Sequence, residues 1–117
     1  MCGIAGFHNT QMNKEGRIRA ILSMNEKMVH RGPDAGGFFA ALPDGCIVGD
    51  SVGGTEETGI IASENGMVLG HRRLSIQDLS EAGAQPIISH DKHLVMVYNG
   101  EIYNATQIRT DLEKDKG

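Results

Sequence analysis

The 117-residue chain has few aromatic residues, no tryptophan and only two cysteines. Because only 4% of its residues are aromatic, it lacks the stacking platforms that bind single-stranded nucleic acid. No run of Lys or Arg exceeds two residues, and the formal net charge is -4, which argues against a phosphate backbone as a partner. We therefore expect a small-molecule ligand and no nucleic acid.

Long hydrophobic runs are also missing. No apolar stretch approaches the ~20 residues that cross a bilayer, and the first residues lack the pattern of a secretory signal, so we expect no membrane partner. The cysteines are Cys2 and Cys46, too few for a disulfide framework in a chain without an export signal. A reducing cytoplasm is the expected location.

What the chain does contain is one helix-like segment, several strand-like segments and a second helix-like segment. Residues 3–7 are typical of a buried strand, and residues 13–30 carry apolar side chains at helical spacing. Gly32 in "RGPD" is expected to cap that helix in a left-handed conformation. Short strands are predicted in 36–42, 46–50, 59–63, 67–76 and 93–99, with hairpin turns at 43–45 and 65–66 and an exposed loop at 50–59.

The last segment, 104–117, is predicted to be a short helix. Asn104 is its expected N-cap, and Gln107 follows three residues later, as in a capping box. Ile108 and Leu112 would share its buried face.

Cys2 is the first candidate for chemistry. Most unpaired cysteines are small buried hydrophobes, but removal of Met1 would give Cys2 a thiol and a free α-amine on one residue. A thiol and a terminal amine exchange protons readily near neutral pH, so this residue would supply both nucleophile and base. Acyl transfer through a thioester is the chemistry that such a residue favours.

Acyl transfer also needs donors for the developing oxyanion, and these are sought in "VYNGEIYN". Asn99 and Gly100 follow a strand-like run and could present a side-chain amide and a backbone N–H to one cleft. The alternative interpretation, favoured by the dipeptide alone, is a plain Asn-Gly hairpin turn.

Two adjacent arginines in "GHRRLSI" are the third candidate. On a strand, Arg72 and Arg73 point to opposite faces, so that one can face solvent and the other a pocket, where a guanidinium recognises a carboxylate with two parallel bonds. The alternative is a pair of solvated charges. His90 and His93 are interpreted as surface residues, because no set of Cys or carboxylate ligands completes a metal site; His71 is expected to be structural.

Four stretches, taken in order, carry a family resemblance: "MCGIAGF", "HRGPD", "GHRRLSI" with "GAQP" downstream, and "VYNGEIYN". As an ordered set they resemble class II glutamine amidotransferases, and within these the glutamine-hydrolysing asparagine synthetases. The resemblance implies an α+β fold of the N-terminal-nucleophile hydrolase type, an αββα sandwich of two antiparallel sheets. Residues 1–117 would form an incomplete N-terminal portion of the glutaminase domain.

The resemblance also implies roles for individual residues. Cys2 would attack the glutamine carboxamide, and Asn99 with the Gly100 N–H would form the oxyanion hole. Arg73 would hold the α-carboxylate of L-glutamine. The other implied glutamine-binding residues are Leu74, Ser75, Ile76, Gln77 and Glu101. The loop from Arg31 to Asp34 would shape the site without touching the reaction.

For the whole protein, the resemblance implies that ammonia passes to an ATP-activated aspartate in a C-terminal synthetase domain, with a homodimer as one possible assembly. ATP and Mg²⁺ would belong to that domain, and the glutaminase part is expected to need no cofactor and no metal. The implied acidic segment that grips the substrate α-amino group lies beyond residue 117, and Met1 would separate Cys2 from the terminal amine. Residues 1–117 alone are therefore expected to turn over glutamine poorly or not at all.

Two alternatives stay open. One is an amidotransferase that feeds ammonia to a sugar phosphate or a phosphoribosyl acceptor, although Leu74 and "RGPD" resemble the synthetases more closely. The other is a catalytically silent domain with a regulatory or scaffolding role, which permanent retention of Met1 would favour.

Overall fold

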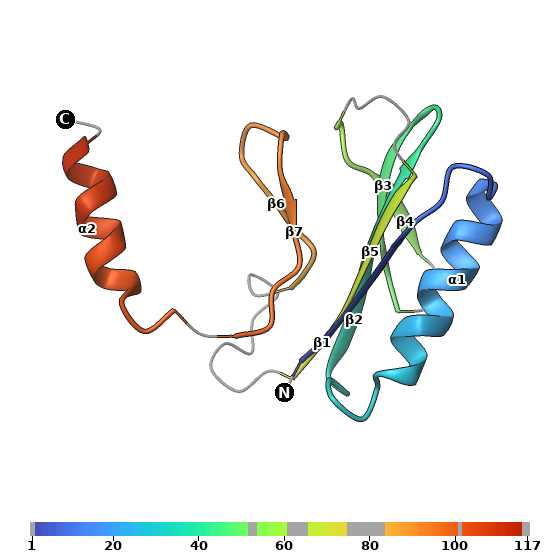
Figure 1. The fold of residues 1–117 in the computed structure, drawn as a ribbon, viewed down its shortest axis with the longest axis horizontal. Coiled ribbons are helices and arrows are strands. Elements are labelled where there is room, and N and C mark those ends of the chain that lie inside the picture. Colours follow the sequence, from blue (N-terminus) through green and yellow to red (C-terminus); the bar gives the residue numbers. More distant parts are fainter. Residues whose placement is uncertain (1, 52–53, 61–65, 75–83, 101, 116–117) are drawn as a thin grey trace.

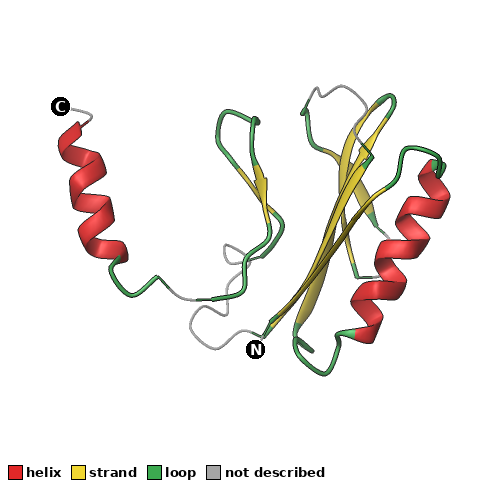
Figure 2. Cartoon of the chain, in the orientation of Figure 1, coloured by secondary structure: helices red, strands yellow, loops and turns green. Residues whose placement is uncertain are grey.

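The computed structural model describes residues 2–51, 54–60, 66–74, 84–100 and 102–115. Its main feature is a five-stranded antiparallel sheet with strand order β1-β5-β2-β3-β4, covered on one face by helix α1 (Figures 1 and 2). The strands of this sheet are β1 (Gly3–His8), β2 (Ala35–Leu42), β3 (Gly45–Asp50), β4 (Thr55–Glu57) and β5 (Met67–Arg73).

Helix α1 (Lys14–Lys27) confirms the first helix prediction. It begins where the Asn13 side chain accepts a hydrogen bond from the Gly16 N–H at 2.8 Å, which satisfies one of the unpaired N–H groups of the first turn. Its apolar positions face the sheet, and Ile21 is fully buried. A core forms between helix and sheet from Ile21, Phe38, Ala40, Leu42, Ile47 and Val68.

The predicted left-handed cap at Gly32 is wrong. The helix ends at Lys27 with Met28 as C-cap, and Gly32 is not among the residues with positive φ. Glycine is needed here for a different reason: a Cβ atom would lie 2.4 Å from the carbonyl carbon of Arg72. The "RGPD" loop therefore packs backbone to backbone against the end of β5.

Two turn predictions have different outcomes. The turn at 43–45 joins β2 to β3 as predicted, with Gly45 at φ 139°. Gly66 also has a positive φ, 68°, but β4 and β5 are not neighbours in the sheet, so Gly66 joins no pair of adjacent strands among the described residues. Asn65 lies outside the described residues.

The exposed loop predicted at 50–59 contains a strand. β4 pairs with β3 at the edge of the sheet, and all three of its residues are exposed. An edge strand exposed on both faces needs only backbone hydrogen bonds, so its sequence shows no apolar alternation. In the predicted strand 59–63, Gly59 and Ile60 are not in a strand, and 61–63 lie outside the described residues.

The C-terminal region consists of β6 (Ile87–Ile88), β7 (Val95–Met96) and α2 (Ala105–Asp115). The two short strands form an antiparallel hairpin on the side of the large sheet opposite α1, and α2 lies beyond it (Figure 1). The second helix prediction is confirmed, but the prediction of a buried face is wrong. Ile108 is 42% exposed and Leu112 58% exposed, and no residue of α2 is buried.

The fold is α+β, as predicted. One complete layered unit is present, with α1 on the large sheet, and the second sheet has only the strands β6 and β7 within the described residues. The complete αββα sandwich therefore stays a prediction. No described helix is both long and apolar enough to span a bilayer.

Candidate active site

Pairing between the first strand and the fifth strand brings Cys2 to the end of β5. The register aligns Gly3 with Arg72, so that Cys2 lies beside the next residues of the chain. The Leu74 N–H donates to Cys2 Sγ at 3.4 Å, and Sγ lies 3.9 Å from the Leu74 carbonyl oxygen. Arg31 Nε donates to the Cys2 carbonyl at 3.3 Å. The half-buried thiol thus contacts the backbone of Leu74, while the "RGPD" loop bonds the backbone of Cys2 through Arg31.

The two arginines occupy opposite faces of β5, as strand alternation predicts. Arg72 lies on the α1 face, where its Nε donates to the Gly32 carbonyl at 2.8 Å and the residue lines a cavity of about 490 Å³ beside α1. Arg73 shares the opposite face with His71. The expectation that one arginine faces solvent is wrong, because Arg72 is 8% exposed and Arg73 9% exposed.

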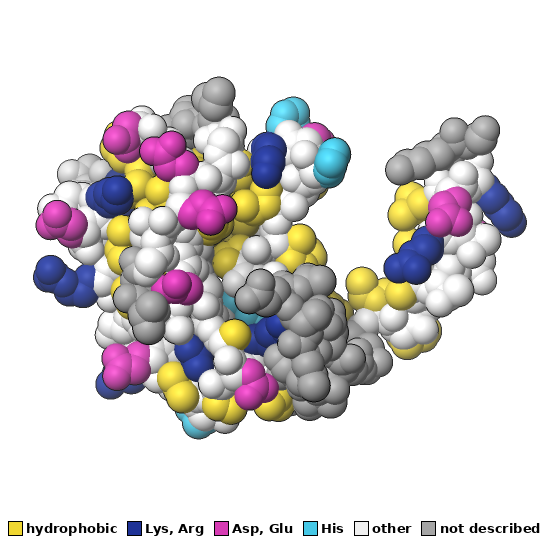
Figure 3. Space-filling model, turned by 180° about the vertical axis from the view of Figure 1, so that it is seen from behind, with side chains coloured by type: hydrophobic (Ala, Val, Ile, Leu, Met, Phe, Trp, Pro, Cys, Tyr) yellow, Lys and Arg dark blue, Asp and Glu magenta, His cyan; other side chains and the backbone are white. Residues whose placement is uncertain are grey.

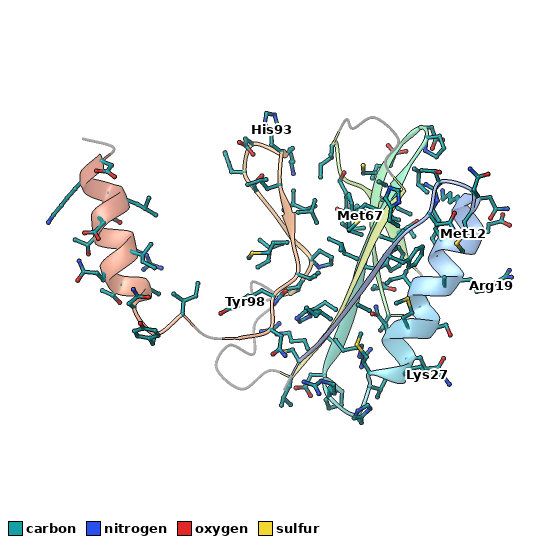
Figure 4. The ribbon with its side chains drawn as sticks, in the orientation of Figure 1. Met12, Arg19, Lys27, Met67, His93 and Tyr98 are labelled. Carbon is teal, nitrogen blue, oxygen red and sulfur yellow. The ribbon has the colours of Figure 1, made fainter. Side chains whose placement is uncertain are left out.

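The segment with Asn99 and Gly100 is anchored to that same opposite face. His71 Nε2 donates to the Tyr98 carbonyl at 3.1 Å, and Gln85 bonds both backbone groups of Tyr98. Tyr98 lies below the β6–β7 hairpin, level with the lower part of the large sheet (Figure 4). Asn99 is half-buried and Gly100 is exposed. The site residues of the C-terminal region therefore reach the sheet through their neighbour Tyr98.

These contacts place two parts of the predicted site near one end of β5. The thiol contact is at Leu74 and the Tyr98 contact is at His71, three residues earlier on the chain. Within the described residues, no hydrogen bond joins Cys2 to Asn99 or Gly100. The predicted contributions of Ser75, Ile76, Gln77 and Glu101 fall outside the described residues.

Electrostatics at His71 follow from its burial. The ring is 1% exposed, and loss of solvation lowers its pKa from the ordinary 6.5; the Tyr98 carbonyl raises it by a smaller amount, and the nearby Arg73 lowers it further. The neutral imidazole is therefore favoured, and because Nε2 faces a carbonyl oxygen, that nitrogen carries the proton. His71 is buried and hydrogen-bonded, and His90 and His93 are exposed on the hairpin, as predicted.

Sequence reasoning missed the contacts of Gln85 with Tyr98. The stretch "GAQP" contributed to the resemblance, but no role was predicted for its side chain. Gln85 and Tyr98 are 13 residues apart, and neither helical nor strand periodicity relates positions at that separation across a turn. The one available signal was an amide side chain next to Pro86, in a segment that the resemblance singled out.

Comparison with known proteins agrees with these features. A family model described as a glutamine amidotransferase domain matches residues 49–117. Glutamine-hydrolyzing asparagine synthetase 1 of Bacillus subtilis is 34% identical over 115 residues, covering 97% of this chain and 14% of that protein. A probable glutamine-hydrolyzing asparagine synthetase of Schizosaccharomyces pombe is 33% identical over 113 residues, covering 97% of this chain and 16% of that protein.

Asparagine synthetase B of Escherichia coli, also glutamine-hydrolyzing, is 33% identical over 111 residues, covering 95% of this chain and 16% of that protein. The chain thus spans about a sixth of the length of these relatives. No solved structure matches the chain.

Proposed function

Because this chain belongs to the glutamine amidotransferase domain family, we propose that it is the glutamine-hydrolysing part of an asparagine synthetase and that Cys2 is its nucleophile. The observation that carries the proposal is the position of the Cys2 thiol at the end of β5, against the Leu74 N–H. The segment with the candidate oxyanion donors is fixed to the same strand through Tyr98. The homology to the N-terminal region of asparagine synthetases supports the assignment.

In the proposed reaction, Cys2 Sγ attacks the side-chain carboxamide carbon of L-glutamine, and the thiol proton passes to the α-amine that removal of Met1 exposes. The tetrahedral oxyanion is stabilised by the Asn99 amide and the Gly100 N–H. The amine then gives its proton to the departing nitrogen, so that ammonia leaves as the C–N bond breaks. Water hydrolyses the glutamyl thioester, which releases glutamate and restores the thiol.

The α-carboxylate of glutamine is proposed to bind Arg73. This side chain lies on the same sheet face as His71, which bonds the segment with Asn99 and Gly100 through Tyr98. A guanidinium binds a carboxylate with two parallel bonds. Leu74, Ser75, Ile76, Gln77 and Glu101 are proposed to complete the pocket. No metal or cofactor takes part in these steps.

The use of the ammonia is also a proposal, because the chain spans only a small part of its relatives. In a synthetase, ammonia would react with an aspartate activated by ATP, with Mg²⁺, in a domain separate from these residues. We propose a cytoplasmic location, and a homodimer is one assembly compatible with this function.

Measurement of glutamate release from L-glutamine tests the proposal. In a complete, mature protein that contains these residues, with removal of Met1 confirmed by intact mass, Cys2→Ala is expected to reduce glutaminase activity to the uncatalysed background, because the substitution removes the thiol that forms the thioester. Cys46→Ala is the matched control, since Cys46 is 3% exposed within the sheet core and should affect stability more than chemistry.

A diazoketone analogue of glutamine provides a second readout. It should alkylate the mature wild type at Cys2 and leave Cys46 unmodified. A complete, processed protein that neither releases glutamate nor becomes labelled would contradict the proposal and favour the catalytically silent alternative.

A further inference from the structure

The backbone of Tyr98 is held by side chains rather than by a regular strand. Its N–H donates to Gln85 Oε1 at 2.6 Å, and its carbonyl accepts from Gln85 Nε2 at 3.0 Å and from His71 Nε2 at 3.1 Å. A carbonyl oxygen has two lone pairs, so both are in use. One amide side chain therefore bonds both polar groups of one residue, and a buried imidazole adds a third bond.

These three bonds determine the direction of the next peptide. The Tyr98 carbonyl belongs to the same planar unit as the Asn99 N–H, and the Tyr98 N–H belongs to the unit before it. Two successive peptide planes are thus fixed, and the Asn99 side chain and the Gly100 N–H begin from that fixed frame. Without these bonds, a segment that belongs to no regular strand ladder would be free to reorient.

Both side chains that hold Tyr98 are supported by the large sheet. His71 lies within β5 and is 1% exposed. The backbone of Gln85 lies directly on β2: a Cβ atom at Gly37 would be 2.2 Å from the Gln85 carbonyl oxygen. The contacts therefore connect the segment with Asn99 and Gly100 to strands β2 and β5 of the large sheet. A loop positioned in this way can hold catalytic geometry.

We propose that Gln85 and His71 are positioning residues for glutamine hydrolysis, which aim the Asn99 amide and the Gly100 N–H at the oxyanion. The inference rests on the proposed function. Neither residue is assigned a contact with substrate, and each acts through the backbone of Tyr98. A purely structural role is the competing explanation, and it predicts loss of stability without a specific loss of turnover.

Steady-state kinetics of Gln85→Leu in the complete, mature protein separate these explanations. We expect kcat to fall by about 10 to 100-fold, the order of loss produced by misplacing catalytic groups by about 1 Å. KM should change by less than about 3-fold, because oxyanion donors stabilise the transition state more than bound glutamine. Gln107→Leu is the matched control, since Gln107 lies on exposed α2 and contacts only Asp111 among the described residues; it should retain wild-type kcat.

Gln85→Glu gives a pH-dependent form of the same test. The carboxylate keeps an acceptor for the Tyr98 N–H but loses the donor to the Tyr98 carbonyl, whereas the protonated acid can donate again. The kcat of Gln85→Glu relative to wild type should therefore rise as pH falls from about 8 to about 5.5, since a carboxyl facing a carbonyl is more easily protonated. Gln107→Glu should show a flat ratio.

Failure of this inference is distinguishable from failure of the proposed function. Amide hydrogen exchange of Tyr98 and the backbone resonances of Asn99 and Gly100 report on the three hydrogen bonds to the Tyr98 backbone and require no turnover. Faster exchange at Tyr98 and shifted resonances in Gln85→Leu, but not in Gln107→Leu, are the expected result. Wild-type exchange and kcat in Gln85→Leu would overturn the positioning role, whereas an inactive wild type of the complete, mature protein would overturn the proposed function itself.

Discussion

The N-terminal body, defined as β1 to β5 with α1, and the C-terminal arm, defined as residues 84–115, differ in how their apolar residues are buried. Among the residues that the structure describes, every buried hydrophobic residue lies in the body, whereas no residue of α2 is buried. Figure 3 shows α2 separated from the rest, with hydrophobic side chains directed into open space. The radius of gyration, 15.3 Å, exceeds the ~13 Å expected for a compact chain of this length.

Comparison of the two helices shows what an amphipathic pattern can predict. Both α1 and α2 were predicted from apolar residues at helical spacing, and both exist. In α1 the apolar face contacts three strands of the sheet, while in α2 Ile108 and Leu112 stay exposed. The pattern identifies the face that can be buried, and the presence of a second surface decides whether it is buried.

The largest contrast between body and arm is expected from truncating one apolar residue in each. Phe38→Ala removes a fully buried ring from the core and should lower the free energy of unfolding by about 3–5 kcal/mol. Leu112→Ala, at a position 58% exposed, should change it by about 0.5 kcal/mol or less. Urea unfolding followed by circular dichroism measures both; equal losses would show that α2 is packed in solution.

The connection between body and arm is expected to break at Gly37. Gly37→Ala places a Cβ 2.2 Å from the Gln85 carbonyl oxygen, and a backbone atom cannot move as cheaply as a side-chain end. We expect a loss of about 1–3 kcal/mol, together with faster amide exchange at Tyr98. A variant with normal stability and normal Tyr98 exchange would show that the arm does not rest on β2.

Much of the body was predictable from sequence, and the reasons are local. Strand-like runs bounded by turn residues located β2, β3 and their turn, and the helical spacing around Ile21 located α1. Strand β4 was missed because its pairing uses backbone groups only. Gly32 was recognised as special for the wrong reason, because a close approach by the Arg72 backbone leaves no signal in the sequence around Gly32.

The candidate site was less predictable than the fold. The resemblance nominated residues at both ends of the chain, and the register of β1 with β5 explains how Cys2 meets Leu74. The positions of Asn99 and Gly100 depend on Tyr98 and Gln85, a pair related by tertiary contact alone. Residue types therefore nominated the proposed reactive groups, but they could not identify the side chains that bond Tyr98 next to Asn99.

The two helix starts offer a smaller test of body against arm. Asn13 caps α1 through its side chain, so Asn13→Ala should cost about 1 kcal/mol. Asn104 was the predicted cap of α2, but among the described residues only its backbone carbonyl bonds, to the Ile108 N–H at 3.1 Å. Asn104→Ala should therefore leave stability unchanged in the same unfolding measurement. A comparable loss in both variants would show that the Asn104 side chain caps α2 in solution.

The smallest expected effect comes from titration of His71, at the junction of body and arm. Burial lowers the pKa of this residue in the folded chain, while the unfolded chain keeps a value near 6.5. Between these two values the unfolded state binds more protons, so the free energy of unfolding falls as pH falls below about 6.5 and levels off below the folded pKa. His71→Gln removes the titrating group while its amide can still donate to the Tyr98 carbonyl. Urea unfolding at a series of pH values should therefore show a wild-type slope below about pH 6.5 that is weaker in His71→Gln; identical pH profiles would show that His71 is not buried against the arm.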